Sequence, residues 1–158
     1  MNAITQAKNL FYENISLVDK CKNDNSLLYL TKLNHVPQTI KDIRQKIMDK
    51  YGLHDSFNNP ELQDFIFESK PGKYLSPHTD HLKGLKEDEY MHWRANWVVQ
   101  APENDVFIFG NDGDLYKIVE NEFYLIDALK PHGISKIKGE KALLLYSFGF
   151  IKKKVSNV

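Results

Sequence analysis

The stretch Lys73-Tyr74-Leu75-Ser76-Pro77-His78-Thr79-Asp80 reads as the end of a β-strand that carries a His-x-Asp pair. Side chains two residues apart on an extended backbone project to the same side. The imidazole of His78 and the carboxylate of Asp80 can therefore converge on one point. The rest of the chain is interpreted as the scaffold around that point.

A third candidate ligand, His132, lies far downstream in the segment KPHGIS (130–135), at the start of another strand-like run. Two imidazoles and one carboxylate on one face, with the other coordination positions open, are the ligand set of a non-haem Fe(II) site. The sequence thus predicts a metal site made by His78, Asp80 and His132. The alternative for His78 and Asp80 is a turn shaped by a local side-chain hydrogen bond, a common role for Asp.

From residue 62 onward the hydrophobic pattern has a period of two, which indicates β-strands. Short strands separated by regular turn signals favour a sandwich or jelly roll. The predicted fold is therefore mainly β with flanking helices, a cupin-like jelly roll. The expected strands are 27–33, 62–69, 74–78, 91–100, 106–109, 115–119, 123–128, 132–138 and 141–150, with 115–119 and 123–128 forming one hairpin around residues 120–122.

Helices are expected near the N-terminus, and the charged stretch 82–90 is expected to form a loop or a short helix near the site. Residues 3–21 have approximately helical spacing, and a clearer helix begins near Pro37 and ends at Gly52, both of which suit those positions. Residues 54–60 read as a polar loop. The length fits one domain over 1–158, in which 1–58 support a β core over 62–150.

The strand MHWRANWVVQ (91–100) alternates between two faces. His92, Arg94 and Asn96 fall on one face, and Trp93 and Trp97 on the other. If the first face lines a barrel, Arg94 and Asn96 are suited to bind a carboxylate or peptide group. If that face meets solvent instead, the tryptophans form core. We count His92 and Trp93 as further candidate substrate-binding residues.

Composition narrows the expected partners. The chain has 21 basic and 21 acidic residues, so the formal net charge is zero and nothing calls for nucleic acid or an anionic membrane as the main partner. Cys21 is the only cysteine, which excludes an intrachain disulfide and is consistent with a reducing compartment. No signal peptide or transmembrane stretch is evident, so a cytoplasmic protein is expected.

With these residues placed, the stretch from about Leu62 to Phe150 resembles the Fe(II)/2-oxoglutarate-dependent oxygenase superfamily, in particular prolyl hydroxylase and aspartyl/asparaginyl hydroxylase-type members. The resemblance rests on the Pro71-Gly72 turn, the His-x-Asp pair, the strand pair over 115–128, Pro131-His132-Gly133 and a basic residue on the following strand. It implies a double-stranded β-helix, Fe(II) as cofactor, and 2-oxoglutarate and O2 as cosubstrates. The implied reaction is hydroxylation of a C–H bond in a protein, peptide or amino-acid-like substrate.

The resemblance also implies residues for the cosubstrate. Lys141, nine residues after His132, would pair with the far carboxylate of 2-oxoglutarate, with Lys138 and Lys136 as weaker candidates. A lysine here departs from the family pattern, in which arginine is the commoner partner of this carboxylate. Arginine can make two parallel hydrogen bonds to a carboxylate, whereas lysine is a point charge. Tyr74 shares the strand parity of His78 and could donate to 2-oxoglutarate. His81 is expected beside the metal.

Two other functions stay open. A cupin-like metalloenzyme that does not use 2-oxoglutarate would keep the triad and leave Lys141 idle. A non-catalytic jelly-roll binding module would use His78 and Asp80 only to shape a turn. The sequence does not identify the substrate or the oligomeric state.

Overall fold

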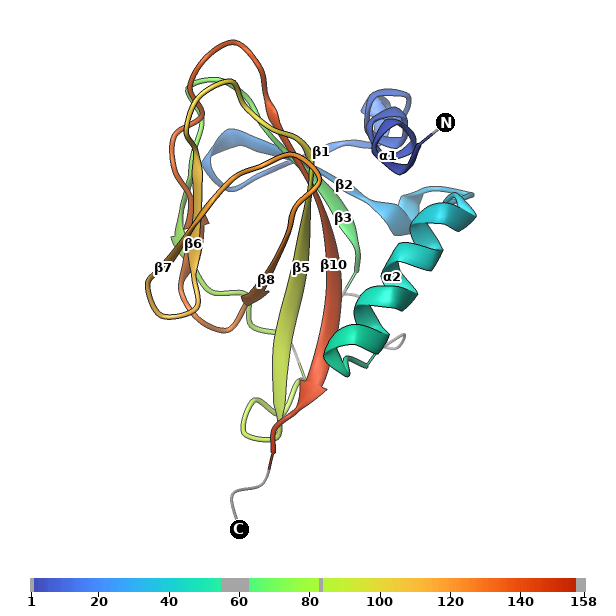
Figure 1. The fold of residues 1–158 in the computed structure, drawn as a ribbon, viewed down its shortest axis with the longest axis vertical. Coiled ribbons are helices and arrows are strands. Elements are labelled where there is room, and N and C mark those ends of the chain that lie inside the picture. The colour runs from blue at the N-terminus through green and yellow to red at the C-terminus, as the bar shows by residue number, and fades with distance from the viewer. Residues whose placement is uncertain (1, 55–62, 83, 156–158) are drawn as a thin grey trace.

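The computed structural model describes residues 2–54, 63–82 and 84–155. Two antiparallel sheets face one another, and both α-helices cover the outer face of the larger sheet (Figure 1). The larger sheet has the strand order β1-β2-β3-β10-β5-β8, and the smaller has β4-β9-β6-β7. The strands are β1 (Asp19–Cys21), β2 (Asn25–Tyr29), β3 (Phe65–Ser69), β4 (Leu75–His78), β5 (Tyr90–Gln100), β6 (Phe107–Gly110), β7 (Asp114–Lys117), β8 (Phe123–Asp127), β9 (His132–Ile134) and β10 (Leu143–Lys153).

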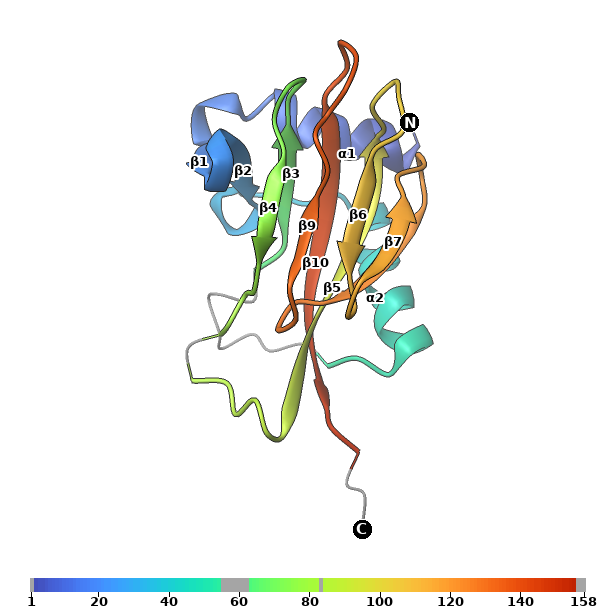
Figure 2. The same ribbon diagram turned by 90° about the vertical axis from the view of Figure 1, so that its left-hand side faces the viewer.

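This arrangement confirms the predicted fold class, a mainly β jelly roll with flanking helices. Strands close in sequence alternate between the sheets: β3 is in the larger sheet, β4 in the smaller, β5 in the larger and β6 in the smaller. Viewed from the side of the smaller sheet, β4, β9, β6 and β7 lie in front and the helices behind (Figure 2). Such alternation rolls the chain into a double-stranded β-helix.

Two layers of apolar side chains hold the fold together. One core lies between the larger sheet and the helices and includes Phe11, Ile40, Trp97 and Phe148. The other lies between the two sheets and includes Ile108, Ile134 and Leu145. Neighbouring residues of one strand divide between the cores because successive side chains point to opposite faces.

The second helix, α2 (Gln38–Tyr51), agrees closely with the prediction. Its apolar stripe buries Ile40 and Ile47, and Gly52 ends it in the left-handed conformation, with φ of 61° and its N–H bonded to the Met48 carbonyl. Pro37 occupies the N-cap position and makes no side-chain capping hydrogen bond. The partly buried Arg44 connects α2 to the sheet, because its guanidinium bonds Asp64 at 2.9 Å and the Gly149 carbonyl at 2.9 Å.

The first helix is shorter than predicted. It covers Ala3–Tyr12 (α1), where Asn2 caps the N-terminus by accepting a bond from the Thr5 N–H at 2.9 Å. The expected continuation to residue 21 is wrong, because a 3-10 turn at Ile15–Leu17 and then strand β1 replace it. The expected strand over 27–33 begins at Asn25 and gives way at Leu30 to a 3-10 turn.

The predicted hairpin between 115–119 and 123–128 is also wrong. β7 pairs with β6 in the smaller sheet, and β8 pairs with β5 in the larger. Both segments have the alternation of strands, but the short connection between them crosses from one sheet to the other. Residues 55–62, which include most of the predicted polar loop and the start of the strand expected at 62, lie outside the described residues.

Within the described residues, no helix is both long enough and apolar enough to cross a membrane.

Candidate metal centre

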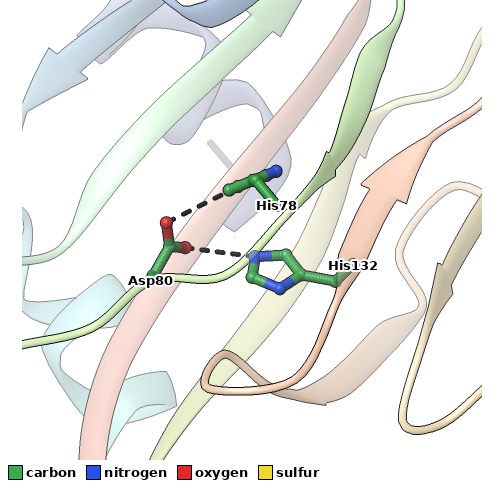
Figure 3. A group of neighbouring side chains, drawn as sticks. All are labelled: His78, Asp80 and His132. Carbon is green, nitrogen blue, oxygen red and sulfur yellow. Dashed lines mark hydrogen bonds and ion pairs between the residues drawn. The ribbon is translucent and has the colours of Figure 1, made fainter.

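Three predicted ligands, His78, Asp80 and His132, meet at one end of the space between the sheets. His78 ends β4, His132 begins β9, and the two residues are direct cross-strand partners. Their ring centroids are 4.3 Å apart. Asp80 follows β4 and turns its carboxylate to both rings, at 3.5 Å from His78 Nε2 and 3.1 Å from His132 Nε2 (Figure 3).

Backbone carbonyls orient both imidazoles. His78 Nδ1 lies 3.0 Å from the Ser76 carbonyl oxygen, and His132 Nδ1 lies 2.8 Å from that of Lys130. A carbonyl only accepts, so each Nδ1 carries the proton and donates it. When the imidazole is neutral, the Nε2 lone pair then points at the centre of the triad, which is the tautomer that a metal requires.

Main-chain contacts also hold Asp80. Its N–H donates to the Ala128 carbonyl at 2.7 Å, and its own carbonyl accepts a bond of 3.0 Å from His92 Nδ1. The loop that carries the carboxylate is thereby fixed to the larger sheet. Asp80 is thus positioned by contacts that involve neither histidine of the triad.

The donor set fits a divalent ion. The three candidate ligand atoms all lie within 4.8 Å of one another. Metal–ligand bonds of about 2.1 Å place neighbouring ligand atoms roughly 3 Å apart at right angles, so the site needs only small adjustment. Two imidazoles and one carboxylate leave the opposite coordination positions open for other molecules.

Electrostatics keep the carboxylate ionised and at least one imidazole neutral. Burial alone would raise the pKa of Asp80, but the hydrogen bond from His132 and the charges of His132, His78 and Arg94 outweigh it, and the net pKa is lowered. Burial lowers the pKa of His78, against the opposing effect of its bond to Ser76. The lowered pKa of His78 favours the neutral imidazole that a metal ligand needs, and a bound cation would replace the histidine charges in keeping Asp80 ionised.

A cavity of about 760 Å³ opens beside the triad and is lined by both sheets. Of the predicted substrate residues, His92, Arg94 and Asn96 line it. The alternation predicted for β5 is therefore confirmed, and its polar face looks into the barrel instead of into solvent. The exposed His81 also lines the cavity, and its Nδ1 is paired with Glu87.

Three predicted site residues are placed elsewhere. Lys141 is exposed just before β10 and is not among the residues that line the cavity. Tyr74 is 48% exposed and precedes β4. Trp93 packs in the helix-side core, since it has the opposite strand parity to His92.

Sequence reasoning missed some cavity-lining residues, notably Ser147 and Lys22. Ser147 is fully buried on β10, and within the described chain its hydroxyl has no hydrogen-bond partner. A lone hydroxyl in the apolar run KALLLYSFGF (141–150) was the available signal. Lys22 lies in a 3-10 turn, where no periodicity indicates which way it points.

No protein-family model matches the sequence, and no curated protein matches it. Solved structures do match its fold. A prolyl-4-hydroxylase of Pseudomonas putida has a TM-score of 0.61 at 10% identity, over 96% of this chain and 86% of its own. A viral collagen prolyl hydroxylase of Paramecium bursaria Chlorella virus-1, in its 2OG complex, has a TM-score of 0.61 at 14% identity, over 98% and 92%.

HygX of Streptomyces hygroscopicus, with nickel, 2-oxoglutarate and hygromycin B bound, has a TM-score of 0.59 at 12% identity, over 95% of this chain and 79% of its own. Identities this low establish the fold and not the activity. The chain has the double-stranded β-helix fold of the Fe(II)/2-oxoglutarate oxygenases.

Proposed function

We propose that the protein is an Fe(II)- and 2-oxoglutarate-dependent oxygenase that hydroxylates a C–H bond of a protein, peptide or amino-acid-like substrate. The observation that carries the proposal is the triad geometry. Both Nδ1–H groups are bound to backbone carbonyls, and both Nε2 atoms converge with the Asp80 carboxylate. A turn that merely used His78 and Asp80 locally would not require His132, 52 residues after Asp80, at the same point.

The residues of the chain would have the following roles. His78, Asp80 and His132 would hold Fe(II) on one face. Bound iron would supply dioxygen activation coupled to oxidative decarboxylation of 2-oxoglutarate to succinate and carbon dioxide. The cavity walls would orient cosubstrate and substrate and exclude bulk water. HygX, which shares the fold, has been solved with iron and with nickel and 2-oxoglutarate.

The first test is metal binding by the triad. Titration with Mn(II), followed by calorimetry and by thermal melting, should show one site per chain and a raised melting temperature, because a ligand of the native state stabilises it by mass action. Removing one coordinating side chain should weaken Mn(II) binding at least tenfold, so His132→Ala should abolish the rise in melting temperature. The matched control is His35→Ala, which removes an exposed histidine outside the triad and should leave the titration unchanged.

The second test separates the alternatives. With Fe(II), ascorbate and 2-oxoglutarate, the wild-type protein should form succinate, and His132→Ala should not. Metal binding without any effect of 2-oxoglutarate on melting or turnover would favour a cupin-like metalloenzyme. A protein that takes up no Mn(II) or Fe(II) at all would be a non-catalytic jelly-roll module.

A further inference from the structure

Across the cavity from the metal triad, β5 and β10 present a polar patch made by Arg94, Asn96 and Ser147. All three residues line the cavity. Asn96 and Ser147 are direct cross-strand partners, and Arg94 lies two residues from Asn96 on the same face of β5. The patch therefore occupies one region of the larger sheet, facing the smaller sheet that carries the histidines.

Elsewhere between the sheets, the cavity wall is mostly apolar. Leu145 on β10, Phe67 on β3 and Ile134 on β9 are buried there. Among the described residues that line the cavity, the permanently cationic side chains are Arg94 and Lys22. Lys22 is exposed, whereas Arg94 is only 6% exposed. Arg94 on β5 is therefore the buried cation that a ligand would meet inside the barrel.

Two neighbouring groups of the protein hold the Arg94 guanidinium in place. It donates to the Gln63 carbonyl at 2.7 Å and stacks over the Phe65 ring, with 4.5 Å from the guanidinium carbon to the ring centroid. Burial lowers its pKa to about 10, against the opposing charges of Asp64 and Asp80, so it stays cationic at neutral pH.

Ser147 supplies the second observation. Its hydroxyl is fully buried and lacks a hydrogen-bond partner within the described chain, in a wall that faces the cavity. Buried hydroxyls without a partner are rare in native proteins and call for an explanation. An acceptor brought by a ligand, next to a guanidinium that suits a carboxylate, would provide that partner.

We propose that Arg94, with the Ser147 hydroxyl and Asn96 beside it, binds the distal carboxylate of 2-oxoglutarate, in place of Lys141. The inference rests on the proposed function, because it assumes that the keto-acid end of the same molecule binds a metal held by the triad. The cosubstrate then spans the barrel from the smaller sheet to the larger. Lys141, exposed outside the cavity, has no part in its recognition.

The experiment compares two oxo acids on the Mn(II)-loaded protein by calorimetry. 2-Oxoglutarate and 2-oxopentanoate share the chelating end and differ only in the distal group, a carboxylate against a methyl. The wild-type protein should prefer 2-oxoglutarate by about 10- to 100-fold, the effect of one or two charge-assisted hydrogen bonds. Arg94→Gln should lose most of that preference while its affinity for 2-oxopentanoate stays the same. Lys141→Gln is the matched control and should keep the preference.

If the melting curve of Arg94→Gln shows that this variant does not fold, Ser147→Ala tests the inference independently. It removes one hydroxyl from the patch and should weaken 2-oxoglutarate severalfold without weakening 2-oxopentanoate. The inference is overturned if Lys141→Gln loses the preference while Arg94→Gln and Ser147→Ala keep it, or if the wild-type protein binds both acids equally. Failure of the proposed function is distinct, because the wild-type protein would then bind no Mn(II), or would bind Mn(II) and neither of the two oxo acids.

Discussion

At the scale of single residues, His92 links the two sheets at the metal centre. It is 1% exposed on β5, and its Nδ1–H donates to the carbonyl of Asp80. Within the described chain its buried Nε2 has no hydrogen-bond partner. Burial and the neighbouring Arg94 charge lower the pKa of His92 to about 4, so the native protein holds it neutral.

This burial predicts a loss of stability in mild acid. The unfolded chain binds a proton at His92 near pH 6.5, whereas the native chain binds it only near pH 4, so the His92 contribution is present above pH 6.5 and is lost as the pH falls. Between pH 7 and pH 5 the expected loss is about 2 kcal/mol. Urea unfolding at both values should show it in the wild-type protein and in His35→Gln, and a smaller loss in His92→Gln. An equal loss in all three would contradict the assignment.

At the scale of elements, the neighbouring strands β4 and β6 pack closely against β9 at Gly133. Gly133 is the residue after the metal-ligand candidate His132. A Cβ at Gly133 would lie 2.5 Å from the Leu75 carbonyl oxygen of β4 and would also clash with the Phe109 ring of β6. The Leu75 atom belongs to the backbone and cannot rotate away. Glycine here lets β9 fit between its neighbours, and so keeps His132 opposite His78.

Gly133→Ala should therefore both destabilise the fold and displace His132. Overpacking of this kind typically costs about 1–3 kcal/mol, and Mn(II) affinity should fall as well. The control is Gly113→Ala, which adds the same methyl group in the β6–β7 turn, where no atom lies within 4 Å and only the positive φ of 102° opposes it. It should leave Mn(II) affinity unchanged. Unimpaired metal binding by Gly133→Ala would show that the close packing is not needed for the site.

At the scale of the whole molecule, the larger sheet separates a close-packed layer from a hollow one. Leu144 and Leu145 are adjacent on β10 and both are buried, yet Leu144 belongs to the core under the helices and Leu145 lines the cavity. A side chain beside an existing cavity has fewer contacts to lose, and its removal creates less new void relative to its surroundings. We therefore expect the helix side of the sheet to contribute most of the stability, whereas the cavity lies on the other side.

The two leucines form a matched pair for testing this division. Leu144→Ala should cost about 3–4 kcal/mol and Leu145→Ala about 1–2 kcal/mol of unfolding free energy, measured by urea titration at pH 7. Thermal melting should rank them in the same order. Equal losses would mean that the cavity side is packed as closely as the helix side.

The sequence alone determined what depends on neighbouring residues. The His-x-Asp spacing, the two faces of β5 and the Gly52 helix end follow from backbone geometry over a few residues, and the structure agrees with all three. Only the tertiary structure decided which sheet each strand joins, as with β7 and β8, because their pairing depends on distant partners.

The same distinction applies to the two basic residues near the predicted site. Lys141 has the spacing from His132 that the family resemblance implies, whereas Arg94 has only a place on an alternating strand. Burial is a property of the assembled barrel, which leaves Lys141 in solvent and encloses Arg94. The packing of the two sheets decides which of the two cations faces the cavity, and no local sequence pattern encodes this packing.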